Sequence, residues 1–272
     1  MSGRGGIPWL AITCFVLIVF LYAPLLVATL YAFNSGNRLV WPPEGLSLRW
    51  FGHVFGDELF MKAFSTSMSA ALITAVVSCS IGTIASLVFT RRSTRIARLV
   101  EALGRLPVML PPLFIGIGFV ALMKATTLSP SMTTIVAGHT IIVLPFVILI
   151  VAARLRTYEI EVEQAARDLG ATPIQVIVRV TLPIIAPAIF GAFLVAFAFS
   201  FDELLITNFT SGTQSTVPIY VLGRLRRLVD PSANAVAVIL LLIPWIAFGI
   251  GQVVLKRLTG SGLSDTLMRQ GR

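Results

Sequence analysis

Two adjacent acidic residues, Asp202 and Glu203, stand out in a chain in which only 12% of the residues are charged. They fall in a long apolar stretch, roughly 184–207, towards its carboxyl end. A carboxylate at membrane depth is costly, by about 2.5–3.5 kcal/mol for an Asp at the centre of a span, and usually faces a cavity or a charged partner. Both residues could therefore attract a cationic solute. The alternative is an ion pair with an arginine of another subunit or with Lys124.

A second polar cluster, residues 159–183, interrupts two long apolar stretches. A helical pattern that includes Glu163, Gln164, Ala165, Ala166 and Asp168 stops at Gly170, where a left-handed cap costs little. Thr172 and Pro173 then suit the cap and the first position of a second helix. The pattern predicts a helix, a tight turn and a second helix, which ends near Leu182 and Pro183.

The rest of the chain indicates an all-α membrane protein. Hydrophobic residues make up 56% of it, and the mean hydropathy is +0.91, which is far above the range of soluble domains. A helix needs about 20 apolar residues to cross a membrane. Six stretches are candidates for such spans: roughly 8–33, 65–89, 107–123, 132–152, 184–207 and 236–255.

The fifth of these stretches also carries small residues every four positions, which allow close helix packing in a membrane. They are Ala188, Ala192, Ala196 and Ser200. His139 lies in the fourth stretch, where it is either a hydrogen-bonded packing residue or a proton relay.

Basic residues orient the spans, because Lys and Arg resist translocation. With both termini in the cytoplasm, fourteen of the 21 Lys and Arg residues lie on the cytoplasmic side. The same orientation places the segment 153–183 in the cytoplasm. We expect one transmembrane domain over residues 1–272, with its core at 60–255. The net charge of +9 then reflects topology and not nucleic-acid binding.

Motifs of enzymes are missing from the sequence. It contains no phosphate-binding Gly-x-x-x-x-Gly-Lys-Ser/Thr loop and no His-Glu-x-x-His metal motif. Its two cysteines, Cys14 and Cys79, both fall in predicted spans and suggest neither a disulfide framework nor a metal cluster. We therefore expect a non-catalytic chain without metal or cofactor, whose energy source lies in another subunit.

The spacing of Ala165-Ala166, Gly170 and Leu182-Pro183 resembles the cytoplasmic coupling loop of permease subunits from bacterial ATP-binding-cassette (ABC) importers. Gln164 departs from this pattern, because a Glu is usual there, and Glu163 or Asp168 could supply the missing charge. The resemblance implies a complex in the bacterial inner membrane. Its other members would be a second, homologous permease, two cytoplasmic subunits that bind ATP and Mg, and an extracytoplasmic solute-binding protein, with lipid around the spans.

Two further strings, Ser200–Leu204 and Asp230–Ala235, resemble the second permease subunit of spermidine and putrescine importers. The resemblance implies a polyamine as the transported solute, and it suits the acidic pair, since polyamines are cations. Two alternatives stay open. One is an ABC importer of the same kind that transports another solute, such as ferric iron, thiamine or sulfate. The other is a self-sufficient secondary transporter or channel, which the absence of detectable repeats disfavours.

Overall fold

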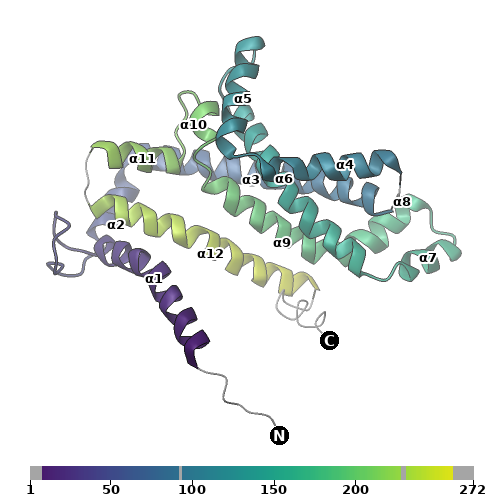
Figure 1. The fold of residues 1–272 in the computed structure, drawn as a ribbon, viewed down its shortest axis with the longest axis horizontal. Helices are drawn as coiled ribbons and strands as arrows, with labels where there is room; N and C mark the ends of the chain where they lie inside the picture. Colours follow the sequence, from purple (N-terminus) through teal and green to yellow (C-terminus); the bar gives the residue numbers. More distant parts are fainter. Residues whose placement is uncertain (1–7, 92–93, 228–230, 260–272) are drawn as a thin grey trace, which may run out of the picture. The chain divides into compact units, whose positions relative to one another are not determined.

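The computed structural model describes residues 8–91, 94–227 and 231–259, and these residues are almost entirely helical (Figure 1). Five segments are long and apolar enough to cross a membrane: Ala11–Ala32, Glu58–Arg91, Met132–Thr157, Pro173–Phe201 and Pro231–Val253. Their helices are α1 (Pro8–Ala32), α3 (Glu58–Arg91), α6 (Met132–Thr157), α9 (Leu182–Phe201) and α12 (Pro231–Thr259). The all-α membrane class is confirmed.

The third expected span, 107–123, differs from the prediction. A 3₁₀ turn, Leu106–Met109, precedes helix α5, Pro112–Ala125, which has only 14 residues. The helix begins at Pro112 because Pro111, in extended backbone, cannot belong to it, and a proline fits the first helical position. A 14-residue helix is about 21 Å long, which is shorter than the roughly 30 Å hydrocarbon core.

The chain divides into two compact units, Met1–Met61 with Val221–Leu242, and Lys62–Tyr220 with Ile243–Arg272. The expectation of a single domain over 1–272 stays a prediction. Both chain ends and Asp230 lie outside the described residues.

The first unit contains α1, the short helix α2 (Arg49–Gly56) and the loop between them. The loop is organised by Asn34, whose side-chain oxygen accepts hydrogen bonds from the backbone N–H groups of Gly36 and Glu44 at 3.2 and 3.1 Å. The indole of Trp50 donates to the Asn34 carbonyl at 2.9 Å. These bonds hold the loop against the start of α2.

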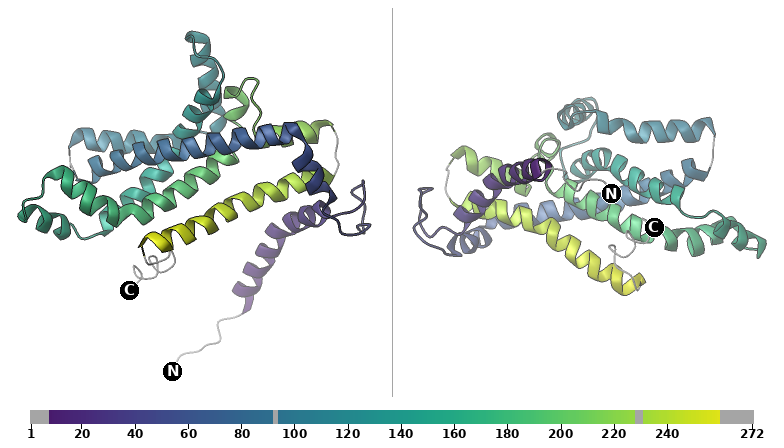
Figure 2. Two further views of the ribbon diagram at one scale, coloured as in Figure 1. Left: turned by 180° about the vertical axis from the view of Figure 1, so that it is seen from behind. Right: turned by 60° about the horizontal axis from the view of Figure 1, so that its bottom comes forward.

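In the second unit, α6 and α9 lie side by side in every view (Figures 1 and 2). Ala192, Ala196 and Ser200 of α9 are buried and Ala188 is half-buried, so three of the four residues of the small-residue stripe lie on a packed face. Two short helices, α7 (Glu161–Asp168) and α8 (Pro173–Val176), lie at one end of this unit, and α10 (Thr207–Thr210) lies towards the other end (Figure 1). The two polar clusters of the sequence are thus at opposite ends of the α6–α9 pair.

Candidate functional site

The turn at Gly170 and the start of the second helix fold as the sequence predicts, but that helix does not end near Leu182 and Pro183, which instead begin α9. Helix α7 ends in a Schellman motif, in which the Gly170 N–H donates to the Arg167 carbonyl at 2.9 Å and the Ala171 N–H to the Ala166 carbonyl at 3.0 Å. Gly170 has a φ of +87°, in the left-handed region that only glycine adopts without strain. Thr172 then caps α8, and Gln175 reciprocates in a capping box, with Pro173 at the first helical position.

Helix α8 continues into α9 through a π-helical turn, Ile177–Thr181. Such a turn contains one residue more than an α-helical turn and is frequent at functional positions. Leu182 and Pro183 open α9 directly after it. The loop is therefore joined to α9 without a flexible linker.

Most of the predicted coupling residues are accessible. Gln164, Ala165, Asp168, Gly170 and Pro183 are exposed, and Ala166 and Leu182 are half-buried. Two large apolar side chains next to them are unusually open, Leu169 at 89% and Ile174 at 75% exposure. The loop thus offers an apolar surface suited to contact with another protein.

Glu163 is the exception, because its side chain points inward and the residue is only 4% exposed. Its carboxylate accepts hydrogen bonds from Arg91 at 2.9 Å and from the Thr181 hydroxyl at 2.8 Å, and also from the Tyr158 hydroxyl. The Glu163 carboxylate is thus engaged inside the chain, and Asp168, which is exposed, is the better placed of the two residues to supply the charge missing at Gln164. No sequence pattern pointed to these partners, since Arg91 is 72 residues away.

At the other end of the unit, the acidic pair lies beyond helix α9 and not inside it. The helix ends at Phe201, and Asp202 is its C-cap residue. The expected span 184–207 is therefore too long at its carboxyl end. The chain breaks after Phe201 and turns into α10, so Asp202 and Glu203 are not part of one continuous helix.

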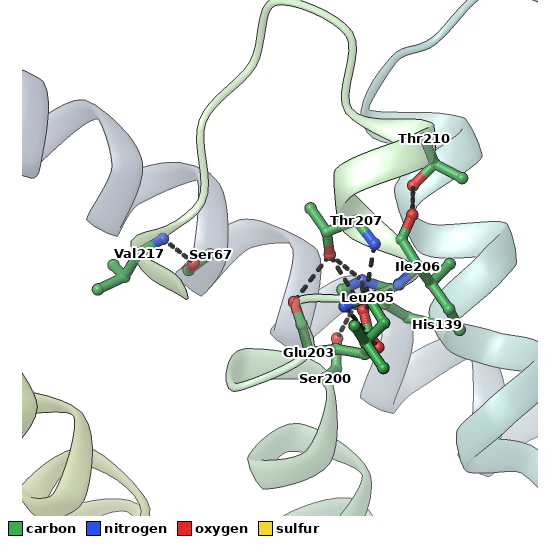
Figure 3. Close-up of polar contacts among 9 residues, drawn as sticks. All are labelled: Ser67, His139, Ser200, Glu203, Leu205, Ile206, Thr207, Thr210 and Val217. Carbon is green, nitrogen blue, oxygen red and sulfur yellow. Dashed lines mark hydrogen bonds and ion pairs between the residues drawn. The ribbon is translucent and has the colours of Figure 1, made fainter. Parts of the chain in front are cut away.

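The carboxylate of Glu203 is used within the chain (Figure 3). One oxygen accepts from the Leu205 N–H at 3.1 Å, and the other accepts from the N–H groups of Ile206 at 2.8 Å and Thr207 at 3.1 Å. These bonds satisfy donors at the start of α10 that have no partner within the helix. Glu203 thus fixes the geometry of the break.

His139 of α6 extends this network (Figure 3). Its two ring nitrogens lie 2.7 Å from the hydroxyls of Ser200 and Thr207, and the residue is 1% exposed. One of these nitrogens lies 3.8 Å from a Glu203 oxygen. A histidine with both nitrogens bound to hydroxyls matches the packing role better than the relay.

Asp202 is in a different position. Its side chain is exposed, and no hydrogen bond or ion pair engages its carboxylate within residues 8–91, 94–227 and 231–259. The same residues show no ion pair between Lys124 and either carboxylate. Loss of surrounding water raises the pKa of both carboxyls, and the hydrogen bonds to Glu203 oppose that rise for Glu203. Of the two, Asp202 is the carboxylate that is available to a solute.

Comparisons with known proteins place the chain in a family of transport proteins. Residues 78–260 match the family model described as "binding-protein-dependent transport system inner membrane component". The putrescine transport system permease protein PotI of Escherichia coli is 35% identical over 246 residues, which cover 86% of each chain. The spermidine/putrescine transport system permease protein PotC of Haemophilus influenzae is 23% identical and covers 89% of this chain and 95% of its own.

Solved structures share the fold at low sequence identity. A chain of a bacterial alginate ABC transporter in complex with an alginate-bound periplasmic protein superposes with a TM-score of 0.70 and 15% identity, covering 94% of this chain and 96% of its own. A chain of the MetNI methionine ABC transporter gives a TM-score of 0.58 and 18% identity, covering 75% and 99%. At these identities the likeness concerns the fold alone.

Proposed function

Because the chain belongs to the family of inner membrane components of binding-protein-dependent transport systems, we propose that it is the permease subunit of an ATP-driven importer of polyamines. The main evidence for a polyamine substrate is the 35% identity to a putrescine permease over 86% of both chains. An accessible carboxylate at Asp202 supports it, since polyamines are polycations and a sulfate-like anion would be repelled there.

In this function the two acidic residues have separate roles. Asp202 offers its carboxylate to an ammonium group of the passing solute and replaces part of the hydration that the solute loses. Glu203 holds the chain break that presents Asp202, through its bonds to the start of α10. The translocation path would run past the carboxyl end of α9.

The loop around α7 and α8 would receive energy from a separate ATPase. Leu169 and Ile174 supply exposed apolar contacts, and Gln164, Ala165 and Asp168 lie on the same accessible loop. ATP and Mg would be bound by that partner, and the present chain would be non-catalytic. The excess of basic residues on the same side supports cytoplasmic termini.

The complete transporter would also contain a second homologous permease, a second ATP-binding subunit and an extracytoplasmic solute-binding protein. Two permease chains would share the path between them. The five long apolar segments and the shorter α5 would lie in the bacterial inner membrane.

Uptake into proteoliposomes tests this proposal. The complex that co-purifies with the chain is reconstituted with its binding protein, and ATP-dependent uptake of labelled putrescine, spermidine, thiamine, ferric iron and sulfate is compared. We expect uptake of the two polyamines only, and stimulation of ATP hydrolysis by them. Uptake of another solute instead would contradict a polyamine substrate. Polyamine uptake that needs no ATPase would contradict the assignment to an ATP-driven importer.

A further inference from the structure

Glu163 joins the loop helix α7 to three other segments of the second unit. Arg91 is the last residue of α3, Tyr158 is the C-cap of α6, and Thr181 ends the π-helical turn before α9. All three donate hydrogen bonds to the same oxygen of the Glu163 carboxylate. One buried charge therefore ties the loop to the ends of three long helices.

Arg91 strengthens this cluster by two further contacts. It donates to the Leu155 carbonyl at 3.4 Å, near the end of α6. Its guanidinium also lies 5.0 Å from the centre of the Tyr158 ring, within the range of a cation–π interaction. Within the described residues, Arg167 of α7 is the other basic group near Glu163, at 3.8 Å and largely exposed. The buried carboxylate thus has one fixed charge partner from α3.

The exposed pair between Arg156 and Glu101 gives a useful contrast. It joins α6 to α4 (Arg95–Arg105) at 2.7 Å, but its side chains are 52% and 23% exposed. Solvent weakens such a pair, whereas the Glu163 carboxylate is shielded and has three donors at once. A buried carboxylate whose oxygen accepts three hydrogen bonds restrains its neighbours more tightly than an exposed pair does.

We propose that Glu163 is a positioning residue for energy coupling, which makes α7 and the adjoining ends of α3, α6 and α9 move as one body. When a docked ATPase displaces α7, the ends of α3, α6 and α9 then move with it. Without this tie, the loop would deform and the long helices would stay in place. This inference rests on the proposed function, because it needs a partner that moves the loop. It assigns to Glu163 a mechanical role inside the chain, not a contact with the partner.

The number of solute molecules imported per ATP hydrolysed tests the proposal. The reconstituted transporter is prepared with wild-type chain, with Glu163→Ala, which removes the shared acceptor oxygen, and with Glu161→Ala, an exposed residue of the same helix, as matched control. Coupling between two sites is typically worth about 5–150-fold, and we expect Glu163→Ala to lower the import ratio at least about fivefold while ATP hydrolysis continues. Glu161→Ala should keep the wild-type ratio.

Each result of this assay either supports or overturns the proposed role of Glu163. An unchanged ratio in an assembled Glu163→Ala complex overturns the proposal and leaves the transport function intact. A wild-type complex without ATP-driven uptake overturns the proposed function and this inference with it. If Glu163→Ala does not assemble, Thr181→Val and Tyr158→Phe each remove one donor and keep the ion pair with Arg91. A lowered ratio in either of these variants supports the proposal, and a wild-type ratio in both overturns it.

Discussion

The separate roles of the two acidic residues give the sharpest prediction. Glu203→Gln keeps the volume of the side chain but replaces one carboxylate oxygen by an amide NH₂ group, which cannot accept. The remaining oxygen of the glutamine should occupy the position that accepts from the N–H groups of Ile206 and Thr207, because two hydrogen bonds are kept there. The amide NH₂ then faces the N–H of Leu205, which the carboxylate satisfied at 3.1 Å.

The size of the effect follows from these bonds. An orphaned N–H costs about 1–3 kcal/mol, and the low end applies because Leu205 is 45% exposed. The bonds to Ile206 and Thr207 lose their charge assistance, which weakens each by about 1 kcal/mol. We therefore expect Glu203→Gln to destabilise this end of the unit by about 2–3 kcal/mol. Asp202→Asn breaks no bond and should change stability by less than about 0.5 kcal/mol.

Thiol labelling during heating measures this difference. Cys79 is buried, so its reaction with a maleimide dye reports unfolding, and Cys14, which is exposed, is first replaced by Ser. Glu203→Gln should unfold at a lower temperature than wild type, and Asp202→Asn at the wild-type temperature. In uptake assays Asp202→Asn should have the larger effect, because it should raise the polyamine KM more than Glu203→Gln does. Equal stabilities, or a larger KM effect for Glu203→Gln, would refute the assignment.

Three further predictions concern other parts of the chain. Gly170→Ala places a side chain at a φ of +87°. Apart from the adjoining residues, no atom of the described chain lies within 4 Å of the new Cβ, so the cost is the backbone strain of about 1–2 kcal/mol. This strain should loosen the loop and lower ATP-coupled uptake, as measured in proteoliposomes. Normal uptake would contradict it. Gly138→Ala brings a Cβ to 2.5 Å from the buried Ile206. The overpacking costs about 1–3 kcal/mol and should lower the unfolding temperature in the same thiol assay. An unchanged temperature would show that the packing adapts. Single cysteines at Leu169 and Trp41 test orientation with a membrane-impermeant maleimide, which should label only the Trp41 position in spheroplasts; labelling at Leu169 would reverse the topology.

Much of the fold was predictable from the sequence. Apolar length alone identified the five long spans, because the bilayer sets a minimum number of residues. The turn at Gly170 and the cap at Thr172 were also predictable, since backbone geometry restricts which residues fit there. The third span was overestimated, because hydropathy does not show where Pro111 and Pro112 begin a helix.

The roles of individual charged residues depended on the tertiary structure. Asp202 and Glu203 are chemically alike and adjacent. Only the chain break after Phe201 turns the Glu203 carboxylate inward to cap α10, whereas the Asp202 carboxylate has no partner among the residues that the structure describes. The sequence placed Glu163 in the expected loop helix, and only the structure shows Arg91 of α3 at 2.9 Å from its carboxylate. Local sequence determines where helices begin and end, because the interactions that decide this lie within a few residues. The partner of a buried charge lies tens of residues away, so only the packed structure identifies it.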